Sequence, residues 1–425
     1  FAGWRPAVAA SMPAADTTYV AKWAVPTSVG TLAALTTALA DAGVSEIIVT
    51  QTIPLPNGTV LNGLGKTVRA QTTGLDAAGA LQSGSAYSLF TVANGSTVSL
   101  GNLTVKGGSA SAITNAGTLT MTNVVIAQSG SATVSGGGGF RNTGKALLQQ
   151  CVLSLNAAAY GGGFVNAGAS AVMTLDGCSV TDNRSLGIGS GGGGCENSGG
   201  AQLYLINSTF SRNRGSEIGG AINNYNGTVY VLHSTITGNL VDTSAGFVCG
   251  GGIGNNGGTV RVVNSLLANN YEKHTGYEAK PSDIGVFSNG AGIYLYNAYC
   301  GAYVTSIVGG LATTGAPANS ADTTVNPVGA GLTGLFSSYG TWNGLSMPVP
   351  VAQADGTHAV PLADGSAALT GGTDVFLAYT ASGVTAIAYG GVPTYLVGTT
   401  GGTKVTLFQG GAARVAGVIG AVGVP

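Results

Sequence analysis

The stretch that decides the fold is residues 219–239, which reads GGAINNYNGTVYVLHSTITGN. Two glycines lead into an apolar residue, an Asn follows two places later, and an alternating, strand-like phrase ends shortly before a further Asn. Five such openings recur at intervals of 24, 31, 27 and 31 residues. Their apolar residues are Phe140, Phe164, Cys195, Ile222 and Ile253. A unit of this size cannot bury its own apolar face, so it must stack on its neighbours as a solenoid.

The strand phrases end in polar residues, and further polar residues follow six positions later. The ends of the phrases are Asp176, Asn207, His233 and Asn264, and the later residues are Asp182, Asn213, Asn239 and Asn270. Equivalent residues of stacked coils lie about 4.8 Å apart. Asn accepts the left-handed backbone of a tight corner, and its amide can hydrogen-bond to the amides above and below. The predicted structural ladder is Asn207, Asn213, His233, Asn239, Asn264 and Asn270.

These patterns predict an all-β fold, a right-handed parallel β-helix with three strands per coil. Residues 28–42 place Leu32, Leu35 and Leu39 on one helical face, with Ser28 as N-cap, which predicts a short helix that covers the open N-terminal end. Residues 1–28 read as an extended arm and 29–325 as the capped β-helix. Residues 326–425 read as an antiparallel β module with strands at 374–379, 394–397 and 404–408.

Composition narrows the class of protein. The chain has 425 residues with 73 glycines, and only 7% of its residues are charged while 44% are hydrophobic. The net charge is −1 with no basic cluster, which gives no nucleic-acid footprint, and no stretch has the length of a membrane span. Weak self-repulsion favours association. The few Lys and Arg residues suit an exposed life outside the cell, and a start at Phe1 suggests a processed or trimmed N-terminus.

The five cysteines show no metal-binding spacing. They are Cys151, Cys178, Cys195, Cys249 and Cys300. The first interpretation is that they are small buried residues of the stack. A disulfide between coils, for example Cys195 with Cys249, is an alternative, and a redox or metal role is a third.

Two phrases resemble known families of surface proteins. Gly-Gly-Ala-Ile222 and Phe210-Ser-Arg-Asn213 are similar to the GGAI and FxxN motifs of the polymorphic outer membrane proteins of chlamydiae. The phrase that ends at Ser265, GGTVRVVNS, resembles the wider group of pectin-lyase-like secreted bacterial β-helix proteins. The strong likeness covers residues 136–270. It implies surface display and adhesion rather than one chemistry. Surface carbohydrate is a separate candidate partner, after a second copy of the chain.

β-Helices also carry polysaccharide lyases and glycosidases, which need clustered carboxylates. The candidates are Asp176, Asp182 with Arg184, Glu196 and Glu217. Asp176 and Asp182 fall in the columns of the predicted ladder, so a structural role is the first interpretation, and the same holds for His233. The glycine runs lack the Asp of calcium-binding nonapeptides. No catalytic residue, cofactor or metal is therefore assigned.

Three further features bear on partners. The column Met173, Tyr204, Tyr230, Arg261 is expected to face outward, where it stabilises the sheet, contacts a second subunit or holds a sugar. The charge-dense stretch 271–283 is expected to be a solvated loop or a partner contact. The N-terminal arm offers Phe1, Trp4 and Trp23 as aromatic anchors on a neighbour's sheet, unless it folds back along its own β-helix.

The leading hypothesis is a non-enzymatic extracellular structural protein that self-assembles into a filament or surface coat and is also a candidate adhesin. A carbohydrate-active β-helix enzyme is the alternative, and a phage-type tailspike is a third.

Overall fold

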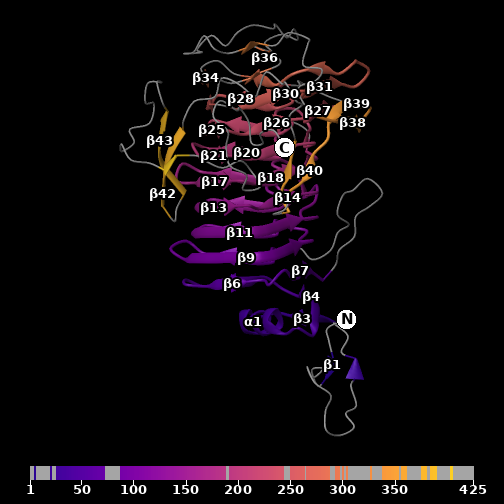
Figure 1. Ribbon diagram of the computed structural model, residues 1–425, viewed down its shortest axis with the longest axis vertical. Coiled ribbons are helices and arrows are strands. Elements are labelled where there is room, and N and C mark those ends of the chain that lie inside the picture. The colour runs from indigo at the N-terminus through magenta and orange to yellow at the C-terminus, as the bar shows by residue number, and fades with distance from the viewer. Residues whose placement is uncertain are drawn as a thin grey trace.

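The computed structural model describes most of the solenoid and parts of both ends. The described residues are 4–5, 20–21, 25–71, 87–187, 191–243, 249–263, 265–287, 292–296, 299–300, 303–304, 326–327, 337–353, 356–360, 375–380, 383–389 and 403–404. Parallel strands stack along one axis from indigo at the N-terminal end to orange (Figure 1). The predicted parallel β-helix is confirmed.

One face of the solenoid is a ten-stranded parallel sheet, to which each coil contributes one short strand. Its strands are β5 (Ile53–Leu55), β8 (Phe90–Val92), β10 (Ile113–Asn115), β12 (Phe140–Asn142), β16 (Phe164–Ala167), β20 (Cys195–Ser198), β24 (Ile222–Tyr225), β28 (Ile253–Asn256), β33 (Ile284–Val286) and β36 (Tyr303–Val304). The first residues of most of these strands form one column of fully buried side chains. That column comprises Phe90, Ile113, Phe140, Phe164, Cys195, Ile222, Ile253 and Ile284. The apolar residues of the repeat are therefore the spine of the core.

The second sheet consists of two rows of strands that meet at a corner. The first row is β6 (Val60–Asn62), β9 (Thr97–Lys106), β11 (Thr118–Ala127), β13 (Lys145–Gln149), β17 (Val172–Asp176), β21 (Gln202–Ile206), β25 (Thr228–Leu232), β29 (Thr259–Val263) and β34 (Gly292–Tyr296). The second row is β3 (Val25–Val29), β4 (Val44–Val49), β7 (Thr67–Ala70), the second halves of β9 and β11, β14 (Val152–Ser154), β18 (Ser179–Thr181), β22 (Thr209–Ser211), β26 (Thr235–Thr237), β30 (Leu266–Ala268), β35 (Tyr299–Cys300) and β37 (Asn326–Pro327). At the corner between the rows the backbone turns left-handed, for example at Asn123 and Asn207.

A third, smaller sheet closes the coils. Its strands are β15 (Ala157–Ala158), β19 (Arg184–Ser185), β23 (Arg214–Gly215), β27 (Leu240–Thr243), β31 (Tyr271–His274) and β32 (Lys280–Pro281). These strands pass close to the glycine runs. A Cβ on Gly193 would lie 2.4 Å from the carbonyl carbon of Arg214, and one on Gly220 would lie 2.7 Å from that of Leu240. Glycine is needed there because the chains approach too closely for a side chain.

A helix covers the N-terminal end, but it starts later than predicted. Helix α1 (Leu32–Ala40) packs against β3, β4 and β5 and buries Leu35 and Leu39. Thr31, not Ser28, is the N-cap, since Thr31 Oγ1 accepts a hydrogen bond from Ala34 N at 3.2 Å. Ser28 lies in β3, which pairs with β4, because the chain forms the first strand of the solenoid before it turns into the helix.

The C-terminal part folds into antiparallel pairs that lie along the solenoid. These are β38 (Tyr339–Trp342) with β39 (Leu345–Pro348), β40 (Val351–Ala352) with β41 (His358–Ala359), and β42 (Val375–Thr380) with β43 (Gly383–Tyr389) and β44 (Thr403–Lys404). In Figure 1, β42 and β43 lie beside the first row, and β43 contacts β13 and β17. Residues 394–397 and most of 404–408 lie outside the described residues. At the other end, β1 (Trp4–Arg5) pairs with β2 (Val20–Ala21).

Residues 337–353 and 356–360, which we call the strap, run over four coils in the direction opposite to the stack. Asn269 Nδ2 donates to Tyr339 Oη at 3.3 Å, and Met347 lies over Gly238. Farther along, Ser179 Oγ donates to the His358 carbonyl at 2.9 Å. The strap therefore fastens the second row of strands from β30 back to β18.

Candidate functional site

The most ordered polar feature is a line of buried amides at the end of the ten-stranded sheet's strands, which we call the first ladder. Each Asn Nδ2 donates to the Oδ1 of the Asn in the next coil, over distances of 2.7–3.0 Å. The members are Asn115, Asn142, Asn166, Asn197, Asn224 and Asn255. All except Asn115 are the Asn residues of the repeated openings, and none of the six belongs to the ladder predicted from the sequence.

A second ladder runs parallel to the first, where the second row of strands ends. Here both the backbone N–H and the side-chain Nδ2 of one residue donate to the Oδ1 of the next, and the side-chain distances are 2.7–3.0 Å. The members are Asn156, Asn183, Asn213, Asn239, Asn270 and Asp283. Asp283 is the last acceptor of this ladder among the described residues. A carboxylate can take this position because the last member only has to accept hydrogen bonds and needs no amide hydrogens to donate to a further member.

The predicted ladder residues fall into two groups. Asn213, Asn239 and Asn270 lie together in the second ladder. Asn207 and His233 occupy the corner between the two rows with φ of 47° and 48°, and neither takes part in either ladder. Asn264 lies outside the described residues.

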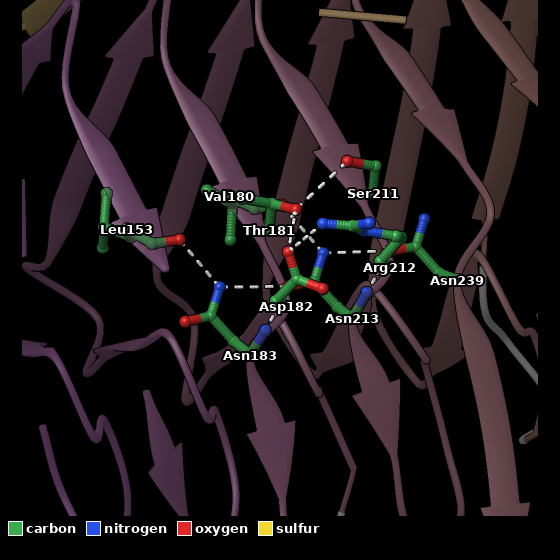
Figure 2. Close-up of polar contacts among 9 residues, drawn as sticks. All are labelled: Leu153, Val180, Thr181, Asp182, Asn183, Ser211, Arg212, Asn213 and Asn239. Carbon is green, nitrogen blue, oxygen red and sulfur yellow. Dashed lines mark hydrogen bonds and ion pairs between the residues drawn. The ribbon is translucent and has the colours of Figure 1, made fainter. Parts of the chain in front are cut away.

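The register predicted for residues 172–183 is wrong by one residue. Met173 pairs with Leu203, so Gly177 stands at the corner that Asn207 occupies in the next coil. Asn183, rather than Asp182, is therefore the ladder member. Figure 2 shows the Asp182 carboxylate directed toward Arg212, to which it is joined at 2.7 Å. A shift of one position matters because neighbouring residues of a strand point to opposite faces.

Directly after the corner, hydroxyl and thiol groups form a further buried column. Ser208 N donates to Ser234 Oγ at 3.1 Å, and Cys178 N donates to Ser208 Oγ at 3.0 Å. Cys151 N donates to Cys178 Sγ at 3.4 Å, and each of these two thiols also donates to carbonyl oxygens. Two cysteines therefore occupy positions that serines hold in later coils.

The four cysteines whose side chains are described are buried, and none of them forms a disulfide, namely Cys151, Cys178, Cys195 and Cys249. Cys195 does not reach Cys249 as a disulfide partner, because it stacks between Phe164 and Ile222 in the core. Burial raises the pKa of the Cys195 thiol well above its usual value. No group of three or more His, Cys, Asp or Glu residues in the described part of the chain could hold a metal ion.

The column of tyrosines lies on the outer face of its sheet but is covered. Tyr204 and Tyr230 stack with ring centroids 4.6 Å apart and planes 3° from parallel. Both residues are only 5% exposed, and burial raises the pKa of both phenols. Arg261 is the paired residue in the next coil, and Thr174, not Met173, is the one before. The stacked rings are therefore inaccessible to a sugar in this structure.

The acidic candidates do not converge on one place in the way that the glycosidase hypothesis needs. Asp182 is paired with Arg212, and Glu217 is placed where its backbone carbonyl accepts the Cys249 N–H at 3.0 Å. Glu196 has a perturbed carboxyl: burial raises its pKa to about 7. Asn223 Nδ2 approaches that carboxyl at 3.4 Å, and Arg141 opposes the rise in pKa. A carboxyl with a pKa of about 7 suits a general acid or base.

The charge-dense stretch 271–283 forms a hairpin of β31 and β32. Its tip is exposed, with Tyr277 72% accessible. Glu272 and Asp283 are buried, however, and burial raises the pKa of Glu272. Part of this stretch is thus structural, and only the tip is available to a partner.

The N-terminal anchors are described only in part. Phe1 and Trp23 lie outside the described residues, and Trp4 is placed as part of the β1 backbone. No helix of the described chain has both the length and the apolar character that a membrane crossing requires.

Comparison with known proteins gives no relative: no family model, no curated protein and no solved structure matches this chain. The geometry described above is therefore the basis for a functional proposal.

Proposed function

We propose that this chain is a non-enzymatic extracellular structural protein that assembles with copies of itself into a filament or surface coat. The observation that carries the proposal is the pair of buried ladders, each of which joins six coils. Their amides are committed to coil-to-coil hydrogen bonds, which suits a rigid rod rather than a reactive cleft.

Composition supports an exposed location and association. Charged residues make up 7% of the chain and the net charge is −1, so copies repel one another little. The resemblance of the repeats to secreted surface β-helices points the same way, and it makes adhesion a second role for the assembled form.

The direct test is negative-stain microscopy of the purified protein together with a variant that lacks residues 1–24. If the arm joins subunits, the parent forms regular filaments or sheets, and the deletion abolishes them while circular dichroism keeps its β signal. A parent protein that stays monomeric at high concentration would refute self-assembly. Filaments that survive the deletion would refute the role of the arm.

A carbohydrate-active enzyme is the second candidate, favoured by Glu196. A carboxyl whose pKa is raised to about 7 by burial can donate a proton near neutral pH. The measurement is the release of reducing or unsaturated ends from pectin, alginate and similar polymers. Activity that Glu196→Gln abolishes and Glu278→Gln spares would establish this reading and displace the structural one.

A further inference from the structure

The N-terminal end of the solenoid presents strands with one unpaired edge. Among the described strands, β5 is the last of the ten-stranded sheet and β3 pairs only with β4. Such edges are templates for strand addition by another molecule. Each of these two strands has an exposed proline inside it, Pro26 in β3 and Pro54 in β5.

Both prolines face the free edge. In a parallel pair, the N–H and C=O of alternate residues point to opposite sides of a strand. Ile53 N donates to Leu89 O at 2.9 Å, toward β8. The backbone nitrogen of Pro54, the next residue, is therefore directed away from β8, toward the free edge. Val29 O accepts from Thr50 N at 2.9 Å, toward β4. Pro26 lies an odd number of residues earlier, so its backbone nitrogen is directed to the opposite side, toward the free edge. The outward edge of β5 has no N–H donor, and that of β3 keeps only the one from Ser28.

The prolines are confined to the outermost position of each column. Along the sheets, Pro54 pairs with Thr91 and Pro26 with Glu46, and the next strands inward also carry residues with an N–H at these positions. In an inner strand the N–H at this position donates to the neighbouring strand on that side. In the outermost strand that side has no neighbour among the described strands, so a proline can replace the donor. At the opposite end, β37 is the last described strand of the second row, and it likewise contains a proline, Pro327.

The rest of the N-terminal end is covered or short. Helix α1 packs across β3, β4 and β5 and seals the core between the two proline edges. The third edge is β6, which has only three residues, and Val60 within it is 76% exposed. Ser99 N donates to Thr59 O at 2.9 Å, so the N–H of Val60 points away from β9.

We infer that Pro26 and Pro54 close the N-terminal end of the solenoid against sheet-to-sheet joining with a second copy of this chain. The inference refines the proposed function, on which it rests for its biological meaning: copies that assemble must do so through the arm or the sides, not by continuing the solenoid at this end. The closed end itself is a property of the single chain and can be tested whether or not the parent protein assembles.

The test is the double variant Pro26→Thr/Pro54→Thr, compared with Pro56→Thr. All three prolines are exposed, but Pro56 lies just outside β5. Pro56→Thr is therefore the same chemical change as the other two substitutions, made at a position that is not part of a strand edge. We expect the double variant to keep the circular dichroism and thermal midpoint of the parent and to sediment faster as its concentration rises, as two opened ends join. Sedimentation identical to that of the parent overturns the inference, and so does equal association of Pro56→Thr.

A second pair of variants tests the edge geometry without relying on association. Val60→Pro removes an outward N–H and should leave the thermal midpoint unchanged, whereas Leu61→Pro removes one directed at β9 and should lower it clearly. Added to the double variant, Val60→Pro should reduce its association. Equal destabilisation by the two prolines would contradict the assigned directions. A parent that is monomeric while the double variant associates would refute self-assembly but uphold the closed end.

Discussion

At the scale of single residues, the buried amides of the ladders should matter more to stability than surface amides, because water can replace a lost partner only at the surface. Asn239 is fully buried, accepts two hydrogen bonds from Asn213 and donates to Asn270 and to carbonyl oxygens. We predict that Asn239→Leu lowers the free energy of unfolding by about 1–3 kcal/mol, because its neighbours lose partners that water cannot replace. Urea unfolding followed by circular dichroism measures this. Asn62→Leu, an exposed amide bonded to Asn102, should cost less than about 1 kcal/mol.

Thiols that stand in for serines should tolerate a hydroxyl. Cys178 Sγ accepts from one backbone N–H and donates to the Leu148 carbonyl, as Ser208 does with the equivalent groups one coil later. Cys178→Ser should therefore change the free energy of unfolding by less than about 1 kcal/mol. Cys195→Ser places a hydroxyl in the apolar column beside Phe164 and should cost about 1–3 kcal/mol. Equal costs at the two sites would contradict the assignment.

Glu196 should make stability depend on pH. Its pKa is about 7 in the folded protein against 4.5 when unperturbed, so between these values the folded state holds the proton that the unfolded state has lost. Stability should therefore fall as pH rises from 4.5 to 7, by on the order of 2 kcal/mol. Glu196→Gln should flatten this part of the profile, measured as the urea midpoint against pH. Exposed Glu278→Gln is the control, and a profile that Glu196→Gln leaves unchanged would argue against the burial effect.

At the scale of elements, the glycine runs reflect close passage of the third sheet. A Cβ on Gly220 would lie 2.2 Å from Gly251 O and 2.7 Å from Leu240 C and O. We predict that Gly220→Ala costs more than about 2 kcal/mol, because rigid backbone would have to move. Gly101→Ala, whose Cβ meets nothing closer than 3.6 Å, should be nearly neutral. Thermal unfolding of the two variants makes the comparison, and similar midpoints would show that the coils adjust freely.

The sequence predicts the stack well because its evidence is local and repeated. Repeats of 24 to 31 residues and recurring Asn residues are enough to infer parallel coils and the members Asn213, Asn239 and Asn270. The register predicted for 172–183 is wrong because Asp182 and Asn183 are adjacent polar residues, and only strand pairing decides which one faces inward. The strap was out of reach: the contact between Ser179 and His358 spans 179 residues and uses a backbone carbonyl, which leaves no pattern in the sequence.

At the scale of the whole molecule, the strap is an addition to the solenoid rather than a part of its core. Met347 is 1% exposed over Gly238, whereas Val351 in the same strap is 44% exposed. Met347→Asp should detach the strap and speed proteolysis within residues 349–353, while the solenoid keeps its circular dichroism. The Val351→Asp variant should be cleaved by the protease at the same rate as the parent protein. Loss of all β structure in Met347→Asp would show instead that strap and solenoid unfold together.

The one-way stacking of coils also determines how the molecule should respond to a pulling force. Each coil is bonded mainly to the coil before and the coil after it, so tension applied at the C-terminal end meets one coil at a time. The strap should release first, since it fastens β30 back to β18 from outside. The coils should then peel in sequence, and each of the repeats of 24 to 31 residues should give a sawtooth step of roughly 90 Å of extended chain. A rod built this way yields gradually under load, coil by coil, and can rewind against the coils that remain.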